Sequence, residues 1–388
     1  MTSPLFKSSP QPAVQPTAQP DRPKPGPQAR STVYAIRPYV GGAAKAKSGK
    51  TIKLSSNEAA FGPSPQAIAA GKTAAASLHR YPDGNAAALR NALQARYHYP
   101  AEQIVCGAGS DEIISLLCQA YLEPGDETLY SAHGFLMYRL STLAAGGTPV
   151  AVPERDLRVQ VDAILDALSP RTKLVFVANP NNPTGSYLTK SELLRLHEAL
   201  PDSVLLCIDE AYGEYASYDI AAPDYSAAGF LVAQGARNLV VTGTLSKLYG
   251  LGGLRVGWGY AAPEIIDVLN RIRGPFNVSS IGQAAAVAAL EDRDWQEKGL
   301  AHNARLLRKV GEGFGRLGLT AYPSLGNFLL VDLDSEARRK AVNAKLAAQG
   351  ILVREVAAYG LPSCLRVTIG TEPEMAACLE GFKTALQR

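Results

Sequence analysis

A lysine directly after a serine, with an arginine eight residues further on, is the most informative chemical feature of this sequence. Ser246 and Lys247 follow the apolar run Leu239–Val241, and Arg255 ends a glycine-rich turn. A hydroxyl and a guanidinium can hold a phosphate, and an amine can react with a carbonyl. A phosphorylated aldehyde needs both, so the stretch predicts a pyridoxal phosphate site if other segments supply the remaining contacts. Alone it is weak, because most lysines beside glycine-rich loops are solvated surface residues.

A second segment could hold the phosphate. Gly109, Ser110 and Asp111 follow the apolar pair Ile104-Val105 and open a helix. The free N–H groups of a helix N-terminus bind phosphate, and small residues let it approach. An ordinary helix capped by Ser or Asp is the competing interpretation.

Two further segments offer groups for the ring of such a cofactor. Asn182 lies in a Pro/Asn turn after an apolar run, and its amide could donate to a phenolate oxygen. Asp209 ends another apolar run, where a carboxylate is costly unless it is paired or used. It could keep a pyridine nitrogen protonated, while Tyr212 could donate to the same phenolate oxygen as Asn182. A helix cap is the alternative role for Asp209.

The elements around these residues predict an α/β fold. Short apolar runs alternate with amphipathic stretches such as 111–121 and 190–200, which is typical of a mostly parallel sheet covered on both faces. The expected strands are 127–130, 148–152, 173–178, 204–209, 239–242 and 255–260. A second αβ pattern follows an Ala-rich helical stretch. All four chemical segments fall at strand ends or helix starts, where doubly wound sheets bind ligands.

The sequence predicts four segments. Residues 1–30 are rich in Pro and Gln and are expected to be disordered. An N-terminal arm over 31–60, a large cofactor-binding domain over 61–275, and a connecting helix with a small C-terminal domain over 276–388 are expected to follow.

Composition favours a soluble cytoplasmic protein. The chain is 46% hydrophobic and 19% charged, and no apolar run is long enough to span a membrane. Its net charge of +4 comes from residues 1–53, which hold nine basic residues and one acidic residue, so no basic face for nucleic acid is expected. The five cysteines are scattered, as in a reduced protein, and no metal site is predicted.

Together these segments resemble the fold-type I pyridoxal phosphate-dependent aminotransferases, and among them the histidinol-phosphate aminotransferases. The resemblance covers about 34–388. The matching stretches are Leu54–Glu58, Arg80–Gly84, Gly107–Glu112, Asn181–Gly185, Asp209–Tyr212, Thr244–Lys247, Tyr359–Pro362 and Leu365-Arg366.

The resemblance implies a role for each residue. Lys247 would join the cofactor aldehyde and move protons, with Asp209 at the ring nitrogen and Asn182 and Tyr212 at the phenolate oxygen. Phe135 would stack on the ring. The phosphate would be bound by Gly109, Ser110, Asp111, Ser246 and Arg255.

The resemblance also implies a homodimer with shared sites, because the tyrosine matching Tyr81 reaches the neighbouring subunit's cofactor phosphate in this family. Arg366 would clamp the substrate carboxylate. Tyr39, Asn57 and Arg354 are further candidates for binding the substrate's anionic groups, and a surface salt bridge is the alternative role for Arg354.

The implied reaction is amino transfer between L-histidinol phosphate and 2-oxoglutarate in histidine biosynthesis. The sequence departs from the family at Ala59-Ala60, where Asn-Pro is usual, and at His133, where Pro is usual. The first departure bears on substrate identity. An aromatic amino-acid transaminase, a phosphothreonine-type decarboxylase and a ligand-sensing regulator stay open as alternatives.

Overall fold

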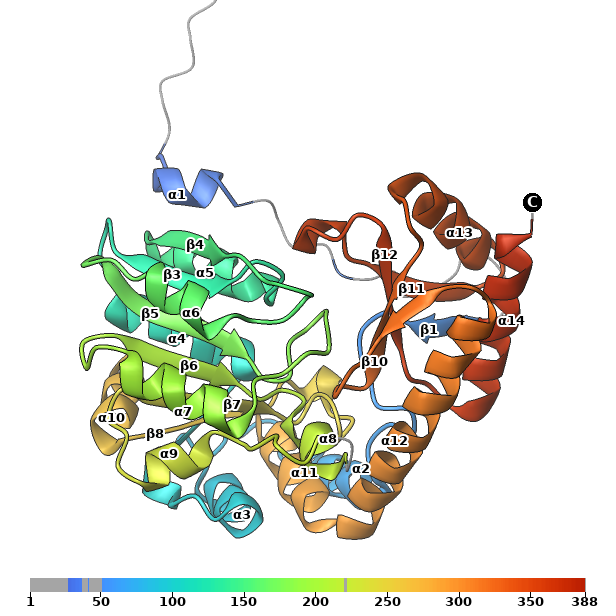
Figure 1. Cartoon of the computed structure of the whole chain (residues 1–388). Coiled ribbons are helices and arrows are strands. Elements are labelled where there is room, and N and C mark those ends of the chain that lie inside the picture. Colours follow the sequence, from blue (N-terminus) through green and yellow to red (C-terminus); the bar gives the residue numbers. More distant parts are fainter. Residues whose placement is uncertain (1–26, 37–40, 42–50, 220–221, 388) are drawn as a thin grey trace, which may run out of the picture.

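The computed structural model describes residues 27–36, 41, 51–219 and 222–387. Within them, seven strands form one sheet and five form another, with helices around both (Figure 1). Residues 1–26, most of the predicted disordered extension, lie outside this description, and so does Tyr39. Arg30, which the prediction included in that extension, donates to the carbonyls of Ala144 and Ala145.

The elements of the described residues agree closely with the predicted runs. The strands are β1 (Ile52–Leu54), β2 (Ile104–Gly107), β3 (Glu127–Ser131), β4 (Thr148–Val152), β5 (Thr172–Ala178), β6 (Leu205–Asp209), β7 (Leu239–Thr244), β8 (Gly257–Ala261), β9 (Thr320–Tyr322), β10 (Phe328–Asp332), β11 (Ile351–Glu355) and β12 (Cys364–Thr368). The α-helices are α1 (Ser31–Tyr34), α2 (Pro65–Ala75), α3 (Ala87–Tyr97), α4 (Ser110–Tyr121), α5 (Leu136–Ala145), α6 (Val161–Asp166), α7 (Lys190–Ala199), α8 (Gly213–Tyr218), α9 (Gly229–Ala233), α10 (Pro263–Ile272), α11 (Ser280–Glu291), α12 (Arg293–Arg316), α13 (Glu336–Ala348) and α14 (Glu372–Leu386). Short 3-10 turns are η1 (Ala101–Gln103), η2 (Gly252–Leu254) and η3 (Ala357–Tyr359).

The large sheet has the order β2-β8-β7-β6-β5-β3-β4. Strand β8 runs antiparallel to both of its neighbours, and the other pairs are parallel. All residues of β6 and β7 are buried, because helices cover both faces of the sheet. This arrangement confirms the predicted α/β class with a mostly parallel central sheet.

The candidate residues lie at one edge of this sheet. The register sets Ala178 at the end of β5 beside Asp209, and Asp209 beside Thr242 of β7. Parallel neighbours end at the same edge, so the segments after β5, β6 and β7 converge there. Lys247 follows β7 by three residues and therefore reaches the same place.

The small sheet has the order β1-β11-β12-β10-β9 (Figure 1). Its edge strand β1 comes from the predicted N-terminal arm and pairs in parallel with β11, about 300 residues later. Helices α12, α13 and α14 enclose its core, in which Phe314 and Phe382 meet edge to face at 4.9 Å. We propose a large domain over 61–275 and a small one over 276–388, to which the arm contributes β1.

No helix in the described part of the chain combines the length and the apolar character needed to cross a membrane.

Candidate active site

A cleft at the edge of the large sheet gathers most of the predicted site residues. Its volume is about 560 Å³, part of which is open to solvent. Its walls are Ser110, Asp111, Phe135, Ala178, Pro180, Asn182, Asp209, Ala211, Tyr212, Thr244, Ser246, Lys247 and Arg255. Nine of the predicted residues therefore line one cavity, although the sequence separates them by up to 145 positions.

One end of the cleft is a cradle of backbone amides at the start of α4. Gly109 precedes the helix with φ +86°, and no side chain caps its N-terminus. A methyl group on Gly109 would lie 2.4 Å from the Arg255 guanidinium, and one on Gly257 would lie 2.3 Å from the Ser110 amide nitrogen. Only glycine allows this approach, and uncapped amides there fit an anion.

Hydroxyl and guanidinium groups complete the cradle. Arg255 Nη1 lies 3.2 Å from Ser246 Oγ, and Nη2 lies 3.3 Å from Asp111 Oδ2. The Thr244 hydroxyl donates to Ser246 Oγ at 2.9 Å and thereby fixes the position of that oxygen. Arg255 itself takes a left-handed backbone conformation, φ +53°, that turns its side chain back toward α4.

The floor of the cleft carries a buried carboxyl group. Asp209 accepts hydrogen bonds from Tyr138 Oη at 3.0 Å and from Thr242 Oγ1 and the Ala211 amide, each at 3.2 Å. Burial raises the pKa of Asp209 to about 6, and the hydrogen bonds from Tyr138 and Thr242 oppose that rise. An acid desolvated in this way gains from a cationic partner in the cleft, such as a protonated pyridine nitrogen.

Asn182 is oriented by an arginine of the small sheet. Arg366 Nη1 donates to Asn182 Oδ1, and Arg366 Nη2 donates to the Ser55 carbonyl at 2.9 Å. Because Oδ1 is an acceptor only, this bond identifies which end of the amide faces Arg366. The Nδ2 donor is thereby available to the cleft, as a phenolate-binding role requires.

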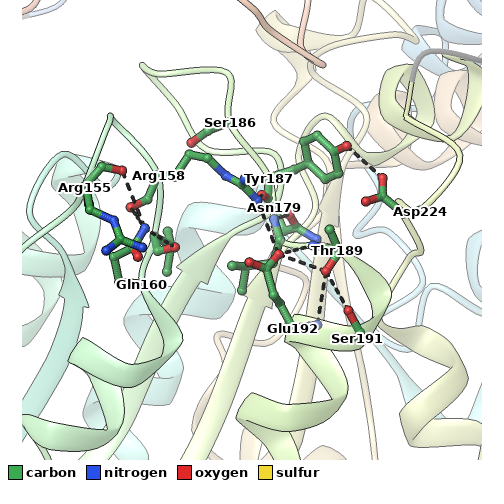
Figure 2. Close-up of polar contacts among 12 residues, drawn as sticks. Arg155, Arg158, Gln160, Asn179, Ser186, Tyr187, Thr189, Ser191, Glu192 and Asp224 are labelled. Atoms are coloured by element: carbon green, nitrogen blue, oxygen red, sulfur yellow. Dashed lines mark hydrogen bonds and ion pairs between the residues drawn. The ribbon is translucent and has the colours of Figure 1, made fainter.

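The loop that carries Asn182 is anchored on its outer side (Figure 2). Asn179 Oδ1 accepts the Leu188 amide at 2.8 Å, and Thr189 with Glu192 forms a capping box at the start of α7. Arg158 reaches across to the Tyr187 carbonyl at 3.2 Å and to Glu192 at 3.3 Å. These contacts fix both ends of the loop.

Tyr212 and Lys247 face the cleft from opposite segments. Lys247 Nζ donates to the Ser56 carbonyl at 3.3 Å and lies 5.7 Å from the centre of the Tyr212 ring. The Tyr212 hydroxyl accepts a hydrogen bond from Asn57 Nδ2 at 2.7 Å. Asn57, predicted as a substrate-binding residue, therefore lies behind Tyr212 and does not line the cleft.

Two contributors escaped the sequence analysis. Tyr138 and Thr242 hold the Asp209 carboxyl, and Tyr138 also meets Phe135 edge to face at 5.9 Å. The sequence signal that could have indicated Tyr138 is its i, i+3 spacing from Phe135 at the start of α5, because residues so spaced share a helix face.

Tyr81 and Arg354 lie away from the cleft walls. The Tyr81 side chain is 83% exposed and stacks on Phe276 at 4.7 Å. Arg354 of β11 pairs in register with Arg366 of β12, so two guanidinium side chains start from adjacent strand positions. The roles predicted for these residues remain predictions.

These residues suit a phosphorylated pyridine aldehyde. An uncapped helix start with an arginine suits its phosphate, a buried acid suits its ring nitrogen, and Asn182 and Tyr212 suit its phenolate oxygen. Lys247 supplies the amine.

Comparison with known proteins agrees with this geometry. The family model described as "Aminotransferase class I and II" matches residues 49–382, so the chain belongs to that family.

Similar relatives narrow the comparison further. A protein of Granulibacter bethesdensis named histidinol-phosphate aminotransferase is 48% identical over 93% of this chain and 95% of its own. One of the same name from Dinoroseobacter shibae is 51% identical over 87% of this chain and 92% of its own. The crystal structure of histidinol-phosphate aminotransferase from Sinorhizobium meliloti in complex with pyridoxal-5'-phosphate superposes with a TM-score of 0.82. It shares 29% identity and covers 92% of this chain and 98% of its own.

Gly257→Ala is predicted to weaken cofactor binding, because its methyl group would displace the Ser110 amide from the cradle. Losing one charge-assisted hydrogen bond to the phosphate corresponds to about a tenfold to hundredfold rise in Kd. This Kd is measured by titrating cofactor-free protein with pyridoxal phosphate while monitoring fluorescence. Gly253→Ala, where nothing lies within 4 Å of the added methyl, is the matched control. An unchanged Kd in Gly257→Ala would contradict the assignment of the cradle.

Asp209→Asn is predicted to stabilise the cofactor-free protein at pH 7. The folded-state pKa of about 6 exceeds the ordinary value, so the folded state loses stability as pH rises from about 4 to 6. The substitution removes a penalty of about 3 kcal/mol at pH 7 that is nearly absent near pH 4. Urea unfolding at both pH values tests this, with the exposed Asp267→Asn as control. An equal effect at the two pH values would refute it.

Proposed function

We propose that this chain is a pyridoxal phosphate-dependent aminotransferase that interconverts L-histidinol phosphate and imidazole acetol phosphate. The amino group would be exchanged with the second substrate pair, 2-oxoglutarate and L-glutamate. The reaction would belong to histidine biosynthesis. The single cleft that gathers Lys247, Asp209 and the cradle at Gly109 carries this proposal. The names and the identities of 48% and 51% of its relatives support the substrate.

The chemistry divides between cofactor and protein. Bound pyridoxal phosphate supplies an electron sink for the charge left when the substrate's α-proton is removed. Lys247 Nζ would take up and return that proton, since it is the amine of the cleft. Asp209 would hold the ring nitrogen protonated, and Asn182 and Tyr212 would donate to the phenolate oxygen.

Two neighbouring arginines support an anionic substrate. Arg366 lies beside Asn182 at the cleft, and Arg354 is its register partner on β11. A guanidinium binds carboxylate or phosphate through two parallel hydrogen bonds, so such a pair can serve both histidinol phosphate and glutamate. We assign the substrate's anionic groups to this pair.

We also propose a homodimer in which Tyr81 approaches the partner's cofactor phosphate. Exposed apolar side chains support this: Ile68 on α2, Leu78 and Tyr81 after it, Ile272 at the end of α10, and Phe276 beyond. An exposed stacked aromatic pair such as Tyr81 and Phe276 is typical of a surface that another chain covers. A cytoplasmic location fits the buried, unpaired cysteines of the described residues.

Purified protein is expected to show the absorbance of lysine-bound pyridoxal phosphate, and glutamate should convert it to that of pyridoxamine phosphate. Comparison of kcat/KM for histidinol phosphate, phenylalanine and tyrosine tests the substrate. Histidinol phosphate should be preferred by more than about tenfold, because the aromatic acids lack the phosphate that the arginines would bind. Lys247→Ala should lose turnover.

Each contrary result of these assays would lead to a different conclusion. Preference for the aromatic acids would replace the substrate assignment, and release of carbon dioxide would indicate a decarboxylase. An absorbance that glutamate leaves unchanged would refute transamination.

A further inference from the structure

Asn57 lies at the junction between the small sheet and Tyr212. Its side chain is buried, and its backbone is left-handed, φ +55°. Asn57 Nδ2 donates to Tyr212 Oη at 2.7 Å, and the Asn327 side chain donates to the Asn57 carbonyl at 3.1 Å. Asparagine and glycine tolerate this backbone conformation best, so the position suits the residue that occupies it.

Thr368 determines which way the Asn57 amide faces. The Thr368 hydroxyl accepts the Asn57 backbone N–H at 2.9 Å and donates to Asn57 Oδ1 at 3.1 Å. Since an amide nitrogen only donates, the amide end that receives the hydroxyl hydrogen must be the oxygen. The Nδ2 donor is then directed at Tyr212, which makes the orientation a consequence of the bond from β12.

The bond from Asn57 determines what the Tyr212 hydroxyl can do. Because its oxygen accepts from Asn57, its own hydrogen remains for an acceptor on the cleft side, where Tyr212 forms part of the wall. Burial raises the pKa of Tyr212 to about 12, while Arg366 and the hydrogen bond from Asn57 lower it. A more acidic hydroxyl is a stronger hydrogen-bond donor.

Arg366 and Thr368 are two residues apart on β12 and so project from the same face of the strand. Arg366 bonds to Asn182 Oδ1, and Thr368 bonds to Asn57 Oδ1. One strand of the small sheet therefore orients two amides, one at the cleft wall and one behind Tyr212.

We propose that Asn57, oriented by Thr368, is a positioning residue that directs the Tyr212 hydroxyl toward the cofactor's phenolate oxygen and strengthens its hydrogen bond there. This assigns Asn57 to the cofactor side of the site and places it outside the substrate's anion pocket. The inference rests on the proposed function for the presence of pyridoxal phosphate, but not for the identity of the amino donor.

The test is the pH midpoint of the absorbance change of the holoenzyme. That midpoint reports the proton shared between the phenolate oxygen and Lys247 Nζ, and a stronger bond from Tyr212 to the oxygen lowers it. Asn57→Gly keeps the backbone conformation and removes the donor, so the midpoint should rise by about half to one pH unit. Asn57→Asp, which places an acceptor beside Tyr212, should raise it further.

Matched variants separate positioning from general loosening. Thr368→Val should raise the midpoint in the same direction, and Thr368→Ser, which keeps the hydroxyl, should restore it. Asn327→Ala removes support from the Asn57 carbonyl but not the donor to Tyr212, so it should lower stability and leave the midpoint unchanged.

A double-variant cycle decides whether the effect passes through Tyr212. In a Tyr212→Phe background, Asn57→Gly should change the midpoint by less than about 0.2 pH unit, because the hydroxyl it acts on is gone. A full shift in that background, or no shift in the parent, would overturn the inference. Either result would leave the proposed function standing, whereas absence of cofactor absorbance in the parent would remove the proposed function itself.

Discussion

The hydrogen bonds that β12 makes with the segments around the cleft are the constraint on which the site depends. Arg366 reaches Asn182 and the Ser55 carbonyl, and Thr368 reaches Asn57. A slip of one residue in the register of β12 would turn both side chains to the other face of the small sheet. Pairing of Thr368 with Phe328 of β10 opposes such a slip, because the Phe328 ring meets Tyr212 edge to face at 5.2 Å. The geometry of the site thus requires both sheets.

The large sheet supplies the other half of the constraint. Its parallel strands bring Asp209 and the segments bearing Asn182 and Lys247 to one edge, and helices on both faces exclude water from the floor. That exclusion makes the Asp209 carboxyl costly to ionise without a cation. Burial of this carboxyl therefore lowers stability, and a cationic ring in the cleft, as predicted for Asp209, would offset that cost.

The sequence was most informative where an apolar run ends in a polar residue. The ends of β5, β6 and β7 were found in this way, because burial on both faces makes such strands continuous apolar runs. Contacts between distant segments left no comparable local signal. The bond from Asn57 to Tyr212 joins residues 155 positions apart, and that from Thr368 to Asn57 joins residues 311 apart. The pairing of β1, from the N-terminal arm, with β11 of the small sheet likewise left no local signal in the sequence.

The structure shows where the two departures from the family pattern, Ala59-Ala60 and His133, lie relative to the cleft. Ala59 and Ala60 lie in a hollow with Trp295 and His302, apart from the walls of the cleft. His133 instead bridges the two parts of the molecule, because its Nδ1 donates to the Tyr359 carbonyl at 2.7 Å. A proline could not make this bond, since it has no polar side chain. The bond ties the segment that leads to Phe135, the residue predicted to stack on the ring, to the turn that precedes Arg366. The His133 departure therefore adds a bond between the two parts of the chain, whereas Ala59 and Ala60 do not line the cleft.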